Sequence, residues 1–433
     1  MIVSSTRNKG FVLASPVILT VLTAISILLL APCCVLFVQC LFSLWRTPPV
    51  QDSVGEELTI AVIIPAHNES EMIVKTLQSV RAQLRQEDRL LVVADNCTDE
   101  TAALARQEGA VVIERQDLAN VGKGFALQRG IEELSDHPPD VLVLIDADCQ
   151  LEPMCLEALA GEAGRRSRPI QGCYLMLPPP NARTSDYISA LAVLIKNRVR
   201  PRGMRNLRLP CLITGSGFAI PWSLLSKIQI ASGNIVEDMQ IAIDLALANA
   251  APIYCDSAVL RSLLPTQRNV VRAQRTRWEH GHLATLRDQV PRLLVSFLRS
   301  GRLSLLAMAL DISVPPLALL TVSVMAMLVA CGGWAIVANA WLPLLVTATS
   351  FFLIASSVSI GWYVVGRTIV PAAKLMYTPL YIITKLPIYF QFLWKPQTTW
   401  VKTSREGTRI DPIEENHPRA HTGQPAPNRR ISQ

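Results

Sequence analysis

Two aspartates, Asp146 and Asp148, directly follow a run of five apolar residues at 141–145. A run of this kind is typical of a strand that is buried on both faces of a sheet. Two carboxylates one residue apart repel each other and resist burial. A divalent cation with oxygen ligands would offset their charge, and it could also bridge the phosphates of a nucleotide. The alternative is a solvated surface loop, and the pattern alone leaves both interpretations open.

A third carboxylate, Asp95, follows the apolar residues 90–94. An aspartate at the end of a strand often accepts hydrogen bonds from a sugar hydroxyl or a base N–H. It could equally cap a helix that begins near Thr98. The two interpretations of Asp95 have equal weight at this point.

A fourth acidic site, formed by Glu237 and Asp238, precedes an amphipathic segment within residues 232–246. A carboxylate at this place could accept a proton from an attacking hydroxyl group. Negative charge at the N-terminus of a helix is also favourable in itself. Without further context, that simpler explanation is the stronger one.

The segment 274–283 places three side chains with binding chemistry on one helical face. Gln274, Arg277 and Trp278 are spaced i, i+3 and i+4. A guanidinium group suits a phosphate, and an indole ring offers a stacking surface for a sugar. The segment therefore predicts a helix that faces a phosphorylated sugar.

The same segment can also be interpreted as a basic helix on a membrane surface. Arg272, Arg275 and Arg277 would then contact anionic lipid. His280 and His282 are expected to be exposed polar residues. The spacing of these residues does not decide between lipid and substrate.

Alternating strands and helices should position these residues. Strands are predicted at 58–66, 89–95, 110–115 and 141–146, with helices at 71–85, 97–109 and 122–134. Short links between such elements imply a mostly parallel sheet with helices on both faces, an α/β fold. Ligands bind beyond the carboxyl ends of strands in such sheets. The separated carboxylates are therefore expected to converge at one edge.

Two long apolar runs flank this α/β segment. Residues 11–45 and 312–366 contain no charged side chain. A membrane-spanning helix needs roughly 20 apolar residues, and a buried core helix is rarely so long. We predict one tilted span within residues 1–50. The later run contains Gly, Asn and Pro at 332–343, so it is expected to form two spans.

Basic residues indicate how the chain is oriented in a membrane. The net charge is +7, and Lys and Arg are frequent between the two apolar runs. By the positive-inside tendency, the central domain should face the cytoplasm from a plasma (inner) membrane. The ten cysteines contain no CxxC pair or zinc spacing, so we expect them to be reduced core residues.

The remaining segments are mixed or polar. Residues 287–301 and 368–394 combine apolar, aromatic and basic residues, and both are expected to lie as helices in the membrane interface. The second could be a third late span, but Lys374 and Lys385 disfavour this. Residues 395–433 are polar and rich in proline, so a disordered cytoplasmic tail is predicted.

The motifs together resemble a known family. In chain order they are PAHNE at 65–69, Asp95, DAD at 146–148, ED at 237–238 and QRTRW at 274–278. This series resembles the processive, membrane-bound family 2 glycosyltransferases, such as cellulose, hyaluronan and poly-N-acetylglucosamine synthases. The resemblance covers about residues 58 to 285. It implies a GT-A-like glycosyltransferase domain at 51–286, followed by interface and membrane helices at 287–394.

The resemblance also implies roles for single residues. Asp95 would hold the uridine of the donor, while Asp146 and Asp148 would contact its diphosphate and a Mg²⁺ or Mn²⁺ ion. Asp238 would be the general base, with Glu237 beside it as a second catalytic residue. The other residues implied to bind substrate are Pro65, His67, Asn68, Glu69, Lys123, Gly215, Gln274, Arg277 and Trp278. Val236 stands where many members have Thr.

The implied activity is metal-assisted, inverting transfer of a sugar from a nucleotide-sugar, a UDP-sugar by resemblance, to a growing glycan. This would serve exopolysaccharide or other cell-surface polysaccharide synthesis, with membrane lipids and synthase or export proteins as partners and no nucleic acid. One alternative is transfer of a single sugar to a lipid, since ceramide glucosyltransferases share much of the pattern. Another is an inactive accessory subunit of a synthase complex.

Overall fold

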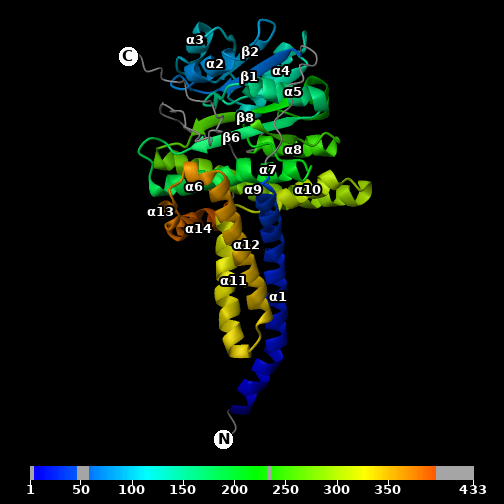
Figure 1. Ribbon diagram of the computed structural model, residues 1–433, viewed down its shortest axis with the longest axis vertical. Coiled ribbons are helices and arrows are strands. Elements are labelled where there is room, and N and C mark those ends of the chain that lie inside the picture. Colours follow the sequence, from blue (N-terminus) through cyan, green and yellow to red (C-terminus); the bar gives the residue numbers. More distant parts are fainter. Residues whose placement is uncertain (1–3, 46–57, 232–235, 396–433) are drawn as a thin grey trace, which may run out of the picture.

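The computed structural model describes residues 4–45, 58–231 and 236–395. It consists of an α/β domain that stands at one end of a stalk of long helices (Figure 1). The disordered tail predicted over 395–433 lies, apart from its first residue, outside the described residues.

The α/β domain is built on one eight-stranded sheet with the order β3-β2-β1-β4-β7-β6-β8-β5. The strands are β1 Ile60–Ala66, β2 Arg89–Asp95, β3 Val111–Arg115, β4 Val141–Leu144, β5 Gln150–Leu151, β6 Ile170–Leu177, β7 Phe218–Pro221 and β8 Ile253–Leu263. The four predicted strands are β1 to β4, and they pair in parallel. β6 and β8 are also parallel, whereas β7 runs antiparallel to β4 and β6, and β5 to β8. The predicted, mostly parallel α/β fold is confirmed.

Helices connect the strands. They are α2 Ile73–Arg81, α3 Thr101–Gln107, α4 Lys123–Leu134, α5 Cys155–Arg166, α6 Thr184–Leu194, the π-helix η1 Ile195–Val199, α7 Arg200–Asn206, the 3-10 helix η2 Trp222–Lys227 and α8 Glu237–Leu247. The three predicted helices are α2, α3 and α4. The predicted start of α3 near Thr98 is wrong. The side chain of Asp99 accepts a hydrogen bond from the backbone N–H of Thr101, and the helix begins there.

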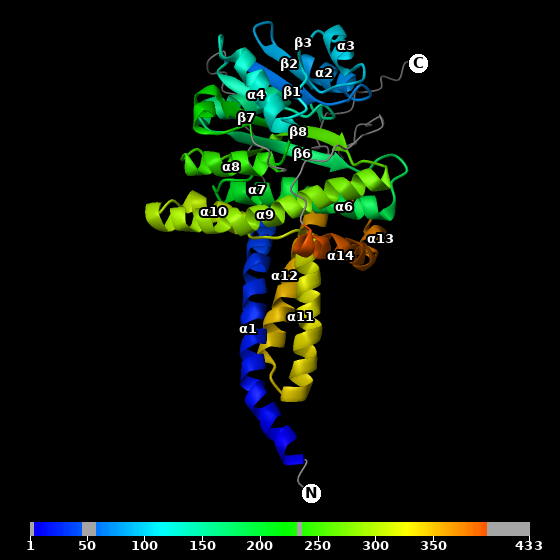
Figure 2. The same cartoon turned by 180° about the vertical axis from the view of Figure 1, so that it is seen from behind.

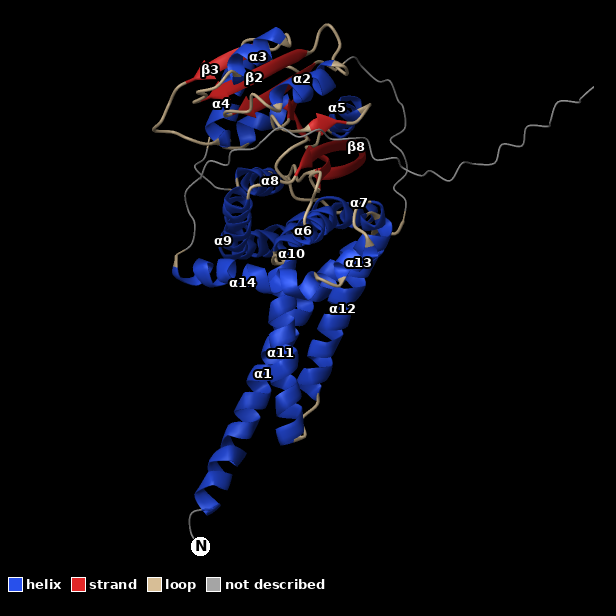
Figure 3. Ribbon diagram, turned by 90° about the vertical axis from the view of Figure 1, so that its left-hand side faces the viewer, coloured by secondary structure: helices blue, strands red, loops and turns tan. Residues whose placement is uncertain are grey.

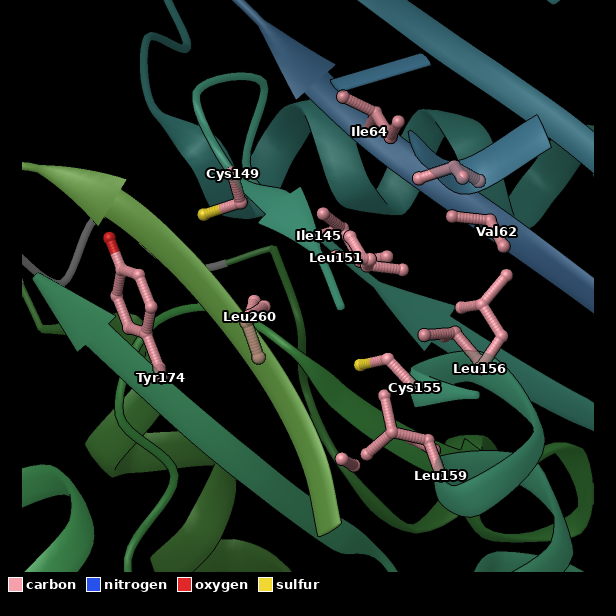
Figure 4. Close-up of a cluster of buried hydrophobic side chains, with 14 of the residues drawn as sticks. Val62, Ile64, Ile145, Cys149, Leu151, Cys155, Leu156, Leu159, Tyr174 and Leu260 are labelled. Atoms are coloured by element: carbon pink, nitrogen blue, oxygen red, sulfur yellow. The ribbon is translucent and has the colours of Figure 1, made fainter. Parts of the chain in front are cut away.

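Alternate residues of the central strand enter different cores. Val62 and Ile64 of β1 pack with α2 and α5, and Figure 4 shows this core. Ala61 and Ile63 point to the opposite face, toward α4 and α8. Because successive side chains of a strand point to opposite faces, a central strand covered on both sides is apolar throughout. This burial fixes the strand ends at which the polar residues lie.

Three helices of the described residues are long and apolar enough to cross a membrane. They are α1 Ser4–Phe42, whose apolar part is Pro16–Phe42, α11 Leu317–Ala338 and α12 Leu342–Val364. They form the stalk in the side view (Figure 3). The break between α11 and α12 falls within the Gly-, Asn- and Pro-containing stretch 332–343, where the sequence predicted it.

Further helices lie across the stalk at the base of the α/β domain (Figure 2). They are α9 Arg268–Ser300, α10 Leu303–Ile312, α13 Ala372–Leu375 and α14 Thr378–Trp394, with the 3-10 turn η3 Gly366–Thr368 before α13. The predicted interface segment 287–301 is the second half of α9, whose first half carries the QRTRW motif. α14 has 17 residues, fewer than the roughly 20 that a span requires. The exposed apolar side chains of these helices, and of the link between α13 and α14, include Leu298, Leu303, Met376, Leu380 and Trp394.

The stalk meets the α/β domain at a glycine contact. A Cβ atom on Gly203 of α7 would lie 1.8 Å from the backbone oxygen of Gln39 in α1. We expect Gly203→Ala to lower the free energy of unfolding by about 1–3 kcal/mol, because backbone cannot move aside as a side chain can. Thermal unfolding of the purified full chain in detergent measures this. Gly332→Ala in α11, with open space at its Cβ position, is the matched control, and equal losses in both variants would contradict the prediction.

Candidate active site

A cavity of about 250 Å³ lies at the carboxyl ends of β1, β2 and β4. Its lining includes Pro65, His67, Glu69, Asp95, Lys123, Asp146, Asp148, Gly215, Glu237, Asp238, Gln274, Arg277 and Trp278. The structure thus brings together all but one of the residues singled out from the sequence. They come from strand ends, from the first turns of α4 and α8, and from one face of α9.

The exception is Asn68, which does not line the cavity. Its backbone is left-handed, with φ 55°, a conformation that Asn tolerates better than most residues. Its side chain bonds the loop after β2: Nδ2 donates to Thr98 Oγ1, and Oδ1 accepts from the Thr98 backbone N–H. Asn68 therefore joins two loops at the cavity edge, and the expectation that it contacts substrate directly is not supported by its position.

Asp146 and Asp148 are arranged as cation ligands. Their carboxylate oxygens, together with Cys149 Sγ, lie within 4.8 Å of one another. Asp148 is buried and Asp146 is partly exposed. Hard divalent cations prefer oxygen donors to sulfur, so the two carboxylates suit Mg²⁺ or Mn²⁺.

Lys123, at the start of α4, ties this acidic pair to the loop before β7. Its Nζ lies 2.5 Å from Asp146 Oδ1 and donates to the backbone oxygen of Gly215 at 2.5 Å. Burial lowers the pKa of Lys123, but the charges of Asp146 and Glu237 outweigh it, and the net shift is upward. Lys123 is therefore a fixed positive charge beside the carboxylates.

Asp95 does not cap a helix. Its Oδ1 accepts a hydrogen bond of 2.6 Å from Arg115 Nη1, and Arg115 Nη2 also reaches Asp117. Arg115 was not among the site residues predicted from the sequence. The sequence could have predicted its place beside Asp95. Arg115 ends the third predicted strand, and neighbouring parallel strands end side by side. Asp95 and Arg115 are indeed register partners in the β2–β3 pair.

Glu237 and Asp238 occupy the first turn of α8 and also line the cavity. Their position therefore fits both favourable charge at a helix N-terminus and a role in proton transfer. Burial raises the pKa of Asp238, while the charges of Lys196 and Lys123 act against the shift. A Cβ atom on Gly215 would lie 3.7 Å from Asp238 Oδ2, so the carboxylate faces that glycine loop. A carboxylate with a raised pKa is a better proton acceptor near neutral pH.

Lys196 is a cavity residue that was not predicted from the sequence. It belongs to η1 and is exposed to the cavity rather than packed in the core. Desolvation by the walls of the cavity lowers the pKa of its ammonium group, and the charge of Asp238 opposes that shift. In the sequence Lys196 begins a segment rich in basic residues, a pattern that is typical of a solvated surface. Only the packing of η1 reveals that it faces the cavity.

The first half of α9 does not form a single lipid-facing stripe. Arg277 lines the cavity, Arg275 lies over the ring of Tyr381 at 5.5 Å, and Arg272 is exposed. Gln274 and Trp278 share the cavity with Arg277, as the spacing i, i+3 and i+4 predicts. The substrate-facing interpretation of this helix therefore fits the geometry better than the lipid-facing one.

The expectation that His280 and His282 are exposed is wrong. Both are buried, and their Nε2 atoms donate to the backbone oxygens of Ile388 and Ile312. The physical reason is that α9 is covered on two sides, by α14 and by α10. These histidines hold α9 in place against its neighbours.

Glu237 is expected to make stability depend on pH. Burial raises its pKa from 4.5 to about 7 in the folded protein. Between these values the folded chain retains a proton that the unfolded chain has released, so the free energy of unfolding should fall as the pH rises from 4.5 to about 7. Denaturant titrations in EDTA across this range measure the fall. Glu237→Gln, which cannot ionise, should flatten it, and identical profiles for both proteins would contradict the prediction.

Two known families match the segments of the chain that contribute the cavity residues. Residues 61–184 match the family described as glycosyl transferase family 2. Residues 141–381, more than half of the chain, match glycosyl transferase family group 2.

Single relatives also match parts of the chain. The "probable glycosyltransferase YdaM" of Bacillus subtilis is 24% identical over 246 residues, which are 54% of this chain and 58% of YdaM. The 4,4'-diaponeurosporenoate glycosyltransferase of Staphylococcus haemolyticus is 33% identical over 113 residues, which are 25% of this chain and 29% of that protein. In both cases the match spans less than two thirds of the relative.

Among solved structures, the mannosyltransferase PcManGT from Pyrobaculum calidifontis, in complex with GDP-Man and Mn²⁺, has a similar fold. The TM-score is 0.51 at 18% identity, and the alignment covers 87% of this chain and 100% of that one. The similarity extends beyond the sheet to most of the chain.

Proposed function

This chain belongs to the family 2 glycosyltransferases, and from that premise we propose that its cavity binds a nucleotide-sugar and transfers the sugar to an acceptor at a membrane surface. One observation carries the proposal: residues far apart in the sequence, among them Asp95, Asp146, Asp148 and Asp238, line the same cavity. The arrangement combines two candidate cation ligands, a candidate base and the cationic side chain of Arg277 in one place.

The donor would lie along the strand ends. Asp95, held by Arg115, would accept hydrogen bonds from the nucleoside, and Lys123 would approach the phosphates. Asp146 and Asp148 would hold Mg²⁺ or Mn²⁺, which when bound neutralises charge on a diphosphate. Arg277 and Gln274 of α9 would face the diphosphate from the other side of the cavity, and Trp278 would offer a stacking surface for the acceptor sugar.

Asp238 would act as the general base. It would take the proton of an acceptor hydroxyl as that oxygen forms a bond to the anomeric carbon. The bond from this carbon to the diphosphate breaks at the same time, and the diphosphate leaves with the electron pair. Arg277 stabilises the developing negative charge on the leaving group. A single displacement of this kind inverts the anomeric configuration.

The acceptor has two candidates. The motif series favours a growing glycan, as in exopolysaccharide synthesis. The number of spans favours a lipid: the described residues provide three candidate spans, and a polar glycan crossing a bilayer needs a pathway shielded by protein on all sides. A polymerising role would therefore require synthase or export partners. An inactive accessory role is disfavoured, because the carboxylates that the chemistry needs are all present in the cavity.

The proposed arrangement places α1, α11 and α12 across the membrane and α9, α10, α13 and α14 along its surface. The exposed apolar side chains of these surface helices would contact lipid. The basic residues between the spans favour an active site on the cytoplasmic side, and the membrane would be a plasma (inner) membrane. The domains 1–50, 51–286 and 287–394 remain a proposal, and their boundary at 286/287 falls within α9.

The proposal is tested by incubating membranes that contain the full chain with a panel of radiolabelled UDP- and GDP-sugars. We expect transfer from a UDP-sugar that is lost in EDTA and restored by Mn²⁺. Product length separates the acceptors, since a ladder indicates a polymer and a single lipid-soluble product indicates one transfer. The proposal would be overturned if the purified, folded chain neither transferred any sugar nor bound UDP in the presence of Mn²⁺.

A further inference from the structure

One short element connects the stalk with the catalytic cavity. The π-helix η1 packs on the spanning helices through Ile195: a Cβ atom on Gly361 of α12 would lie 2.6 Å from Ile195 Cγ1. The next residue, Lys196, lines the cavity. Single-turn π-helices are rare and occur often at functional sites. Two consecutive residues of η1 thus contact the stalk and the active-site cavity.

Lys196 brings a positive charge with no direct partner. Within the described residues, no hydrogen bond or ion pair joins its ammonium group, whereas Lys123 pairs with Asp146. The neighbouring residue Asn197 is held in place by a hydrogen bond from its Nδ2 to the backbone oxygen of Tyr174. The backbone beside Lys196 is therefore fixed, while its side chain remains free to bind a ligand.

The position of Lys196 indicates the acceptor rather than the donor. Lys123, on α4, pairs directly with Asp146, one of the proposed cation ligands. Lys196 instead belongs to η1, the element that packs on the spanning helix α12, and it shares the cavity with Asp238, the proposed base. The donor diphosphate would thus have Lys123 and the metal, whereas Lys196 lines the cavity where η1 meets the stalk.

Resting on the proposed function, we propose that Lys196 binds a phosphate group of the acceptor, which reaches the cavity from the stalk side. A phosphate can come from a lipid head group or from a free phosphorylated molecule. In both cases Lys196 would hold the anion and orient the reacting hydroxyl toward Asp238. Lys196 would then determine specificity for charged acceptors.

The test uses the purified full chain in a neutral detergent, with saturating UDP and Mn²⁺ so that the donor site is filled. Binding of dodecyl phosphate, a single-chain lipid phosphate, is measured by calorimetry and compared with dodecanol and with inorganic phosphate. We expect Lys196→Met to weaken dodecyl phosphate binding by about tenfold or more, because a charge-assisted hydrogen bond is lost. Lys196→Arg should retain binding.

Lys227→Met, which removes an exposed lysine outside the cavity, is the matched control. Lys196→Met should leave UDP affinity and the thermal midpoint unchanged, which excludes a general loss of folding. Strong binding of dodecyl phosphate with weak binding of inorganic phosphate would assign the anion to a lipid, and equal binding would assign it to a free phosphate. Both results support the proposal if they depend on Lys196.

The proposal is overturned if wild-type protein and Lys196→Met bind dodecyl phosphate equally, or if the wild-type protein binds neither phosphate probe. UDP binding separates this failure from that of the proposed function. If UDP binds with Mn²⁺ but phosphate binding does not depend on Lys196, only the role of Lys196 fails. If the wild-type protein does not bind UDP, the donor site itself is wrongly assigned.

Discussion

Replacing Asp238 with Asn is expected to lower the rate of sugar transfer by about a thousandfold, because general-base catalysis contributes on the order of 10²–10⁴. The amide has almost the same shape as the carboxylate but cannot take the proton of the acceptor hydroxyl. Burial of α8 in the second core of the sheet should keep the cavity intact. Initial rates from a radiolabelled UDP-sugar, at saturating donor, measure the loss.

Asp244→Asn is the matched control for this variant. Asp244 lies on the same helix, accepts a hydrogen bond from Gln240 and does not line the cavity. We expect its transfer rate to remain near that of the wild-type protein. The affinity for UDP with Mn²⁺ should be unchanged in both variants. Full activity of Asp238→Asn would exclude Asp238 as the base.

Replacing Asp148 with Asn is expected to remove the dependence on metal together with most of the activity. Neutralising charge on a leaving diphosphate is worth several kcal/mol, so the rate should fall by about a thousandfold. Mn²⁺ should no longer strengthen UDP binding. These effects are measured by transfer assays and by UDP titration with Mn²⁺ and with EDTA.

The same substitution, Asp148→Asn, should not lower the thermal stability of the protein, although it lowers the activity. Removing one of two neighbouring carboxylates relieves their repulsion, so the thermal midpoint in EDTA should be equal to or higher than that of the wild-type protein. Asp136→Asn, an exposed aspartate beyond the other end of β4, is the control and should change neither activity nor metal dependence. Metal-dependent UDP binding that survives in Asp148→Asn would contradict the assignment of Asp148 as a cation ligand.

Local pattern was sufficient for the first half of the sheet. β1, β2 and β4 are nearly continuous apolar runs, and such runs form parallel strands buried on both faces. The convergence of Asp95 with Asp146 also follows from topology, because parallel neighbours end at the same edge. The antiparallel pairing of β7 with β4 and β6 was not predicted, since it depends on contacts between residues far apart in the chain.

Errors arose where a residue's surroundings come from distant segments. His280 was expected in solvent because polar residues usually are, but α14, more than 100 positions later, covers it. The place of Asn68 was likewise not predicted: its side chain bonds Thr98 of the loop after β2 and does not line the cavity. Neither fact is encoded within a few residues of the position concerned.

The sequence alone determined which chemical groups are present and which segments of the first half of the domain form strands and helices, because periodicity and turn residues act over a few positions. It therefore indicated the apolar spans, the strand ends with their carboxylates and the helical face of Gln274, Arg277 and Trp278. The tertiary structure decided which charges meet. Arg115 neutralises Asp95, and Lys196 enters the cavity from a π-helix that the stalk supports. Electrostatic interactions depend on distance in space, and only packing sets that distance for residues far apart in the chain.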